Sequence, residues 1–339
     1  MSAAPVLAIR SSAAATALPF TSPWLLAPME GVTEPSFRDL VLARNAPHEL
    51  GGAFTEFVRV VERAIPVWKM REHLGARRFA QPVGVQLMGN DLDALGETAR
   101  NAVEAGAPLV DVNFGCPAKG ALRGCAGSAL LDDPARLEGV VRAVRDAVPT
   151  VPVTAKIRAG GVDASRIEEL ARAAEAGGAC LLTVHCRTRA ELYQDEVDWQ
   201  RIARAVAAVR IPVCGNGSVL AHADLERMRR ETGAAYAMVG RAALGDPWVF
   251  APRRASRAEA ARFLLEYVET LVGMGASPRG AAGRAKQLLR FWTAGELLGA
   301  PGESAERERV RWLREDDPAR LVAWLRERAE LADRAGADA

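Results

Sequence analysis

The chain has 339 residues, of which 49% are apolar and 25% are charged, and its formal net charge is +2. An intrinsically disordered chain lacks enough apolar residues to form a core, so this composition excludes one. The near-zero net charge also excludes a histone-like polycation, although it leaves a local basic patch open. The length allows one large domain and a small one.

Membrane and secretory signals are weak in this sequence. No run of about 18 apolar residues occurs, so we expect no membrane-spanning helix. The Ala- and Ser-rich N-terminus lacks the charged start of a signal peptide and is interrupted by Arg10, and we expect residues 1–22 to be a flexible extension. Five scattered cysteines favour a reducing, cytoplasmic location over a disulfide framework.

Eight short apolar runs follow one another from Trp24 onward. They end near residues 28, 57, 87, 113, 157, 185, 215 and 239. The segments between them, such as 92–105, 134–147, 164–176 and 221–232, have the apolar spacing of helices. Strands that alternate with helices pair in parallel, and eight such units predict an α/β fold, a closed (β/α)8 TIM barrel, over residues 23–252.

The pattern changes after residue 252, where no further strand-like run occurs. Four helices are predicted there, at 256–273, 281–298, 303–314 and 318–335, separated by Gly, Pro and Asp. We therefore expect residues 253–339 to form a small C-terminal α-helical bundle domain.

Polar residues stand at the carboxyl end of each predicted strand. In a TIM barrel these ends form the active-site face. Polar groups that converge from eight strands on one mouth are hard to explain as packing, and they predict an enzyme. The main candidates are Pro28, Met29, Glu30, Gln86, Asn113, Cys116, Lys156, His185, Asn216, Gly217, Ser218, Gly240 and Arg241.

The last two strands end in loops that favour phosphate binding. They read Gly215-Asn216-Gly217-Ser218 and Gly240-Arg241. Glycines let backbone N–H groups approach phosphate oxygens, and TIM barrels commonly bind phosphate at these two loops. The alternative is two tight turns with a solvated Arg241. No GxGxxG or GxxxxGK[ST] signature occurs, which argues against a Rossmann or Walker site.

Three further side chains favour chemistry at the mouth. Lys156 is one of only four lysines and lies in an apolar strand, where an anionic cofactor would offset its burial. Cys116 lies in a Gly-Cys-Pro turn, and an unperturbed thiol pKa of about 8.5 suits a proton donor better than a nucleophile. His185 ends a strand and could donate to a ligand oxygen. The alternatives are a Lys that reaches solvent, a small buried Cys and a core His.

The other cysteines, Cys125, Cys180, Cys186 and Cys214, have no such context, and we interpret them as structural. No CxxC or HxxxH spacing accompanies them, so no metal site is predicted.

Two basic clusters indicate a polyanion partner. No acidic residue occurs between Glu269 and Glu296, and Arg279, Lys286 and Arg290 share one helical face at about 100° per residue. The second cluster consists of Lys69, Arg71, Arg77 and Arg78. Local clusters on a near-neutral chain favour nucleic acid, and the alternative is a solvated face.

The motifs at these positions resemble those of the tRNA-dihydrouridine synthases. Thr55-Glu-Phe-Val-Arg-Val-Val61 and Arg284-Ala-Lys-Gln287 are most similar to the subfamily that acts on uridine 16. Cys186 and Ser218 depart from the family pattern, which more often has Gly and an acid there. The matching stretches are Ala27-Pro-Met-Glu-Gly-Val32, Thr55-Glu-Phe-Val-Arg59, Val85-Gln-Leu87, Asp111-Val-Asn-Phe-Gly-Cys-Pro-Ala-Lys119, Lys156-Ile-Arg158, Val184-His-Cys-Arg-Thr188, Gly215-Asn-Gly217 and Val239-Gly-Arg241.

The resemblance implies an FMN enzyme that reduces a D-loop uridine of tRNA, U16, to 5,6-dihydrouridine with NADPH. Hydride would pass from flavin N5 to C6, and Cys116 would protonate C5. The implied cofactor-binding residues are Pro28, Met29, Glu30, Gln86, Lys156, His185, Asn216, Gly217, Ser218, Gly240 and Arg241. The implied tRNA contacts are Arg59, Asn113, Arg279, Lys286, Gln287 and Arg290. We expect a monomer that binds tRNA but neither DNA nor a membrane.

Two rival functions stay open at this point. One is an FMN barrel dehydrogenase of a small pyrimidine, of the dihydroorotate or dihydropyrimidine type, which would have no use for a basic helical appendage. The other is a non-catalytic tRNA-binding protein, against which the intact Cys116, Lys156 and His185 argue.

Overall fold

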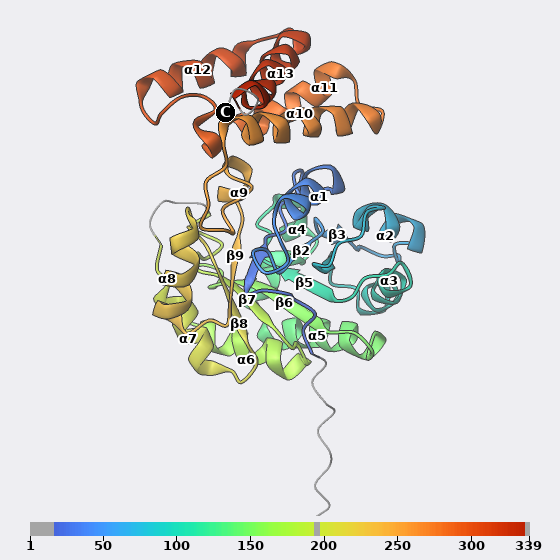
Figure 1. The fold of residues 1–339 in the computed structure, drawn as a ribbon. Helices are drawn as coiled ribbons and strands as arrows, with labels where there is room; N and C mark the ends of the chain where they lie inside the picture. The colour runs from blue at the N-terminus through green and yellow to red at the C-terminus, as the bar shows by residue number, and fades with distance from the viewer. Residues whose placement is uncertain (1–16, 193–196, 336–339) are drawn as a thin grey trace, which may run out of the picture.

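The computed structural model describes residues 17–192 and 197–335, which form a barrel followed by a group of C-terminal helices (Figure 1). Of the predicted N-terminal extension, residues 1–16 lie outside the described part. Residues 17–22 run along the barrel, where Phe20 packs against Phe54 and Tyr236.

Eight parallel strands close into a barrel, which confirms the predicted fold. Each strand pairs with the next one of the eight, and β9 pairs with β1 to complete the ring. A short additional strand, β3 (Val58–Arg59), pairs with β4. The eight strands are β1 (Trp24–Leu26), β2 (Gly52–Phe54), β4 (Val83–Met88), β5 (Val110–Phe114), β6 (Val153–Arg158), β7 (Leu182–His185), β8 (Val213–Asn216) and β9 (Tyr236–Val239).

Helices surround the barrel on its outside (Figure 1). Helices α3 and α5 begin at Asp91 and Asp133, whose side chains accept free N–H groups of the first turn; Asp91 accepts from the N–H of Ala94 at 2.9 Å. The helices are α1 (Pro35–Arg44), α2 (Val67–Leu74), α3 (Leu92–Glu104), α4 (Lys119–Arg123), α5 (Pro134–Ala147), α6 (Ile167–Gly177), α7 (Gln200–Ala208), α8 (His222–Thr232) and α9 (Ala242–Gly245).

Side chains alternate between the two faces of each strand, and this alternation positions the site. Val110, Val112 and Phe114 of β5 point outward and are fully buried beneath the helices. Asp111 and Asn113 therefore point into the barrel. At the amino-terminal end the interior is apolar and includes Leu25, Phe54, Leu109 and Met238.

Up to residue 335, where the described part of the chain ends, four α-helices follow the barrel: α10 (Arg257–Gly273), α11 (Pro278–Leu289), α12 (Glu303–Arg314) and α13 (Pro318–Ala335). The first begins with a capping box, in which the side chains of Ser256 and Glu259 each accept the other's backbone N–H.

The predicted helix over 281–298 is wrong in its extent. Helix α11 begins at Pro278 and ends at Leu289, and a short 3-10 turn (Ala294–Glu296) follows. Gly295 has a φ of 63°, in the left-handed region, which no continuous right-handed helix can contain.

The C-terminal helices pack on the barrel through aromatic rings and ion pairs. Phe37 of α1 meets Phe263 and Tyr267 of α10, with ring centroids 6.0 and 6.2 Å apart. An ion pair joins Arg284 of α11 to Glu34, directly before α1. The β1–α1 connection, at the barrel mouth, is therefore tied to α11.

Candidate active site at the barrel mouth

Five of the predicted site residues form one polar layer at the carboxyl ends of the strands. Asn113 of β5 lies beside Lys156 of β6 in the ladder, and His185 of β7 lies beside Asn216 of β8. Gln86 of β4 is joined to Asn113 by a hydrogen bond of 2.7 Å. The structure therefore brings these side chains together at the mouth.

Lys156 places a cation in this layer. Its Nζ lies 3.4 Å from Oδ1 of Asn216, whose Nδ2 donates to the Met238 carbonyl at 2.8 Å and so fixes the orientation of the amide. Burial, and then the neighbouring Arg158, lowers the pKa of Lys156 to about 8. Its ammonium therefore stays mostly charged at neutral pH.

His185 is a neutral hydrogen-bond donor at the mouth. Burial, followed by the positive charges of Lys156 and Arg158, lowers the pKa of His185 well below its usual value. Its Nδ1 accepts the backbone N–H of Arg187 at 3.2 Å. In a neutral ring the proton must then be on Nε2, which can donate to a ligand.

Cys116 is a buried thiol in a fixed turn. Its backbone N–H and that of Gly115 donate to Oδ1 of Asn113 at 3.0 and 2.8 Å. Its carbonyl accepts from both the N–H and the hydroxyl of Ser128, at 3.1 and 2.8 Å. Burial raises the pKa of the Cys116 thiol, so at neutral pH it carries the proton that a general acid needs.

A glycine lets this turn close. Gly127 has a φ of 58°, and a Cβ there would lie 3.0 Å from the Cys116 carbonyl oxygen and 3.1 Å from Sδ of Met88. Both the backbone conformation and the space therefore favour glycine.

Three side chains at the mouth present hydrogen-bond donors. Oδ1 of Asn113 is used by the turn, so the amide N–H is the group left to face a ligand. Together with Lys156 Nζ and His185 Nε2, this makes a set that complements a ring rich in carbonyl oxygens, such as a flavin or a uracil.

The two predicted phosphate loops lie side by side after β8 and β9, which are neighbours in the sheet. Ser218 has a φ of 51°, and its hydroxyl accepts from Arg187 Nη2 at 2.7 Å. Arg241 is exposed directly before α9. The half-buried Met29 belongs to the next loop, after β1, and its Sδ would lie 3.6 Å from a Cβ added to Gly240.

Pro28 is half-buried in the same β1 loop as Met29, and Glu30 is exposed.

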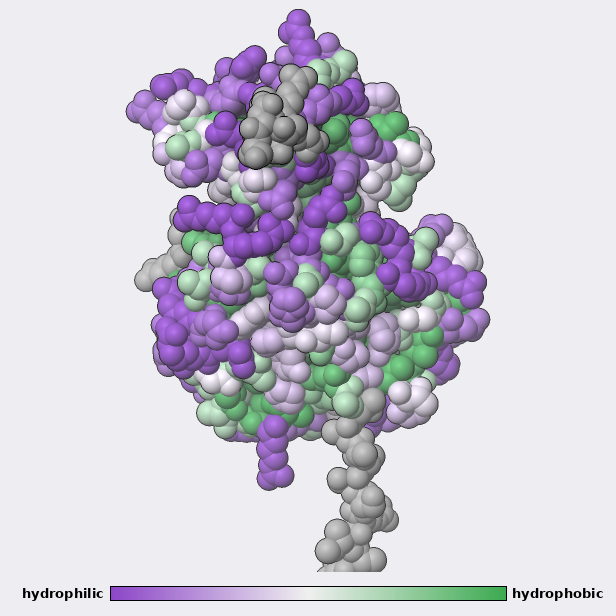
Figure 2. All heavy atoms as spheres, in the orientation of Figure 1, coloured by the Kyte–Doolittle hydropathy of each residue, from purple (hydrophilic) through white to green (hydrophobic). Residues whose placement is uncertain are grey.

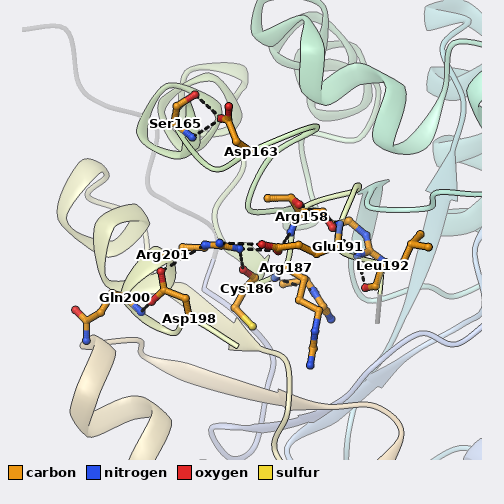
Figure 3. Close-up of polar contacts among 12 residues, drawn as sticks. Arg158, Asp163, Ser165, Cys186, Arg187, Glu191, Leu192, Asp198, Gln200 and Arg201 are labelled. Carbon is orange, nitrogen blue, oxygen red and sulfur yellow. Dashed lines mark hydrogen bonds and ion pairs between the residues drawn. The ribbon is translucent and has the colours of Figure 1, made fainter. Parts of the chain in front are cut away.

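Arginine side chains hold the loop that follows His185 through hydrogen bonds and an ion pair (Figure 3). Arg158 donates to the carbonyl oxygens of Thr188 and Leu192 at 3.1 and 3.0 Å, and its Nε donates to that of Gly115 at 2.8 Å. Arg201 pairs with Glu191 at 2.6 Å. Arg158 therefore links the β7 loop to the Cys116 turn.

The predicted tRNA contacts occupy two places. Arg59, on β3, is exposed and donates to the Gly120 carbonyl at 2.9 Å, close to the segment that follows Cys116. Asn113 also belongs to the barrel, on β5. The others lie on α11 or directly after it, where Arg279, Gln287 and Arg290 are exposed. Figure 2 shows this face of the molecule indented between the C-terminal helices and the side of the barrel that carries α2.

Lys286 differs from its neighbours on α11. It is half-buried, and its ammonium donates to the backbone carbonyl of Glu315, between α12 and α13. The predicted basic face is therefore partly used within the C-terminal helices, and its exposed part is Arg279 and Arg290.

Sequence reasoning missed Asp111 and Arg158 as site residues. Asp111 lies two residues before Asn113 and Arg158 two after Lys156, so the period-two spacing of a strand was the signal that could have found both. In the described residues no three His, Cys, Asp or Glu side chains gather as metal ligands would, and no helix is long and apolar enough to cross a membrane.

Comparison with known proteins gives consistent results. The model of one family, dihydrouridine synthase (Dus), matches residues 25–279. A tRNA-dihydrouridine(16) synthase of Aquipseudomonas alcaligenes is 37% identical over 288 residues, which cover 79% of this chain and 89% of the relative. Another from Pseudomonas putida is 41% identical over 232 residues, covering 66% and 70% of the two chains.

Among solved structures, histamine dehydrogenase from Rhizobium sp. 4-9 is similar with a TM-score of 0.55 and 13% identity, over 89% of this chain and 62% of that one. At this identity the similarity concerns the fold alone.

Proposed function

Because this chain belongs to the dihydrouridine synthase family, we propose that it reduces uridine to 5,6-dihydrouridine in tRNA. The observation that carries the proposal is the buried Cys116 thiol, fixed by its turn beside a mouth that presents hydrogen-bond donors. Relatives named tRNA-dihydrouridine(16) synthase support uridine 16 as the target.

We assign FMN as the cofactor and NADPH as the reductant. The donor set fits a flavin: Lys156 and His185 would face the carbonyl-rich ring, while Asn216, Gly217, Ser218, Gly240 and Arg241 would hold the phosphate end. Gln86 is fully buried, so we assign it a supporting role through Asn113. When bound, the flavin supplies the hydride that reaches C6 of the uracil.

The chain's own residues complete the reduction. The Cys116 S–H bond breaks and a C–H bond forms at C5, and solvent then returns a proton to the thiolate. Lys156 would keep a positive charge beside the bound cofactor. The N–H of Asn113 that does not donate to Gln86 would bind an oxygen of the uracil and orient the base.

A base inside a folded tRNA must leave its stack to reach the barrel mouth. We propose that Arg59 contacts the extruded nucleotide, and that residues 253–339 form a tRNA-recognition domain through Arg279, Lys286, Gln287 and Arg290. The five cysteines are all free thiols, which supports our proposal of a cytoplasmic protein. We also propose that it acts as a monomer.

The function is tested by mapping dihydrouridine in tRNA. We expect tRNA from a deletion strain to lack dihydrouridine at position 16 and to keep it at other D-loop positions. Loss at position 20 instead would refute uridine 16 but not the activity. Reduction of free uracil or orotate in the absence of tRNA would favour a small-pyrimidine dehydrogenase.

We expect the purified protein to be yellow and to release FMN rather than FAD on denaturation. Lys156→Met should weaken flavin binding or slow flavin reduction, because it removes the cation at the mouth. Absorbance and chromatography of the released flavin measure both. Lys69→Met, which removes an equal charge from α2, is the matched control. A colourless protein that does not bind added FMN would contradict the cofactor assignment.

Arg290→Ala and Lys286→Ala test the proposed tRNA-recognition face. Removing one interaction with a tRNA phosphate should lower the slope of log affinity against log salt by about one, while flavin content stays the same. Arg290 is exposed, whereas Lys286 donates to the Glu315 carbonyl. Comparing the two variants therefore separates the loss of a positive charge from the loss of a contact within the C-terminal helices. Arg307→Ala on α12 is the control. Unchanged slopes in both variants would show that this face is only solvated.

A further inference from the structure

A buried carboxyl group lies beneath the mouth and has no part in the mechanism above. Asp111 points into the barrel and is 1% exposed. Its Oδ2 accepts from Nε2 of Gln86 at 2.6 Å, and its Oδ1 accepts from the hydroxyl of Thr154. An ionised carboxylate can only accept hydrogen bonds, so it orients every donor that it meets.

The orientation of the Gln86 amide determines that of the Asn113 amide. Since Nε2 of Gln86 faces Asp111, Oε1 of Gln86 faces Asn113 and accepts from its Nδ2 at 2.7 Å. Oδ1 of Asn113 then faces the turn, where it accepts the N–H groups of Gly115 and Cys116. Each amide could be reversed by itself, but the sequence of hydrogen bonds permits only one orientation.

We propose that Asp111 is a positioning residue whose acceptor-only carboxylate orients the Gln86 and Asn113 amides and so holds the Cys116 turn and the donor polarity of the mouth. Reversal of the amides would direct an N–H of Asn113 at the N–H groups of Gly115 and Cys116, leaving buried donors without acceptors. It would also turn an oxygen of Asn113 toward the ligand. The proposal rests on the proposed function only for the task of Cys116.

The other hydrogen bonds of the turn do not depend on Asp111. Ser128 and Arg158 hold the carbonyl oxygens of Cys116 and Gly115. These contacts leave the backbone N–H groups of Gly115 and Cys116 to Asn113. Protection of these two N–H groups from hydrogen exchange therefore reports on the hydrogen bonds that run from Asp111 through Gln86 to Asn113, which we call the relay.

Asp111→Asn, Thr154→Val and the double variant test the relay, each as flavin-loaded protein. In Asp111→Asn the Thr154 hydroxyl can turn to accept from the new amide, so the Asn oxygen can stay on Gln86. In the double variant residue 154 offers no acceptor, and the new N–H must turn toward Gln86. Thr154→Val alone leaves the carboxylate and the relay in place.

Amide hydrogen exchange of Gly115 and Cys116 is the direct measurement. We expect protection to fall by about tenfold or more in the double variant, less in Asp111→Asn, and not in Thr154→Val, while residues 182–185 stay protected. The kcat for tRNA reduction should fall in the same order with little change in tRNA affinity. Because exchange is measured without tRNA or NADPH, its result is separate from the test of the proposed function.

Equal protection in all four proteins would overturn the proposal, and so would a loss spread evenly over the barrel strands. If the double variant does not fold, Asp111→Ala replaces it, because it removes the acceptor of Gln86 Nε2 altogether. Greater loss at Gly115 and Cys116 in Asp111→Ala than in Thr154→Val supports the relay, and equal loss refutes it.

Discussion

Cys116→Ala should leave reduction of the bound flavin by NADPH nearly intact and slow its reoxidation by tRNA about 10²–10⁴-fold, the usual contribution of a general acid. The reason is the protonation state of the Cys116 thiol. Burial raises its pKa, so it enters the reaction protonated, and Asn113 and Ser128 hold its backbone in place. Alanine keeps the turn and removes only the proton donor.

Stopped-flow absorbance of the flavin measures the two half-reactions separately. Cys180→Ala is the matched control, since Cys180 is a partly buried thiol whose backbone N–H donates to the Val153 carbonyl at the amino-terminal end of the barrel. It should leave both rates nearly unchanged. Equal slowing of both half-reactions by Cys116→Ala would mean that the thiol supports the structure rather than the proton transfer.

The barrel could be predicted from the sequence because its strands are regularly spaced and each is bounded by a loop. The strands observed at Val83–Met88 and Val153–Arg158 end one residue after the predicted ends at 87 and 157. The helix predicted over 281–298 failed for a local reason. Its apolar spacing continues past Leu289, but the left-handed Gly295 ends any helix there, and spacing alone does not show the conformation of a glycine.

The site could be predicted residue by residue but not in its connections. Lys156, His185 and Cys116 stood out at strand ends, yet their protonation states depend on burial and on neighbours from other strands. The ion pair between Arg284 and Glu34 joins residues far apart in the chain. No local pattern predicts such a pair, because neither residue differs in sequence from an exposed charge.

Asp111 is the clearest example of what the sequence hides. In the motif Asp111-Val-Asn113 it looks like a second polar residue at a strand end, and only the structure shows that it is buried with both oxygens occupied. Burial outweighs these hydrogen bonds and raises the pKa of Asp111 from 3.8 to about 6. The ionised form is therefore less stable in the fold than in water.

This shift gives a prediction about stability. Since the pKa of Asp111 is higher in the folded state than in the unfolded state, this group binds more protons in the folded protein between pH 4 and 6, and its contribution to stability falls as the pH rises through this range. The penalty above pH 6 is on the order of 3 kcal/mol, at 1.36 kcal/mol per pKa unit. Asp111→Asn does not titrate, so it should lack this loss.

Denaturant unfolding of the wild type and of Asp111→Asn at several pH values between 4 and 6.5 measures the effect. The other titrating groups are common to both proteins, so the difference between their free energies of unfolding isolates Asp111. We expect this difference to shift in favour of the variant as the pH rises. A difference that stays constant would mean that the hydrogen bonds of Gln86 and Thr154 fully offset the burial of the charge. A shift toward the variant would mean that the fold carries an ionised carboxylate at a cost in stability, as expected if the carboxylate serves to orient the amides that hold Cys116.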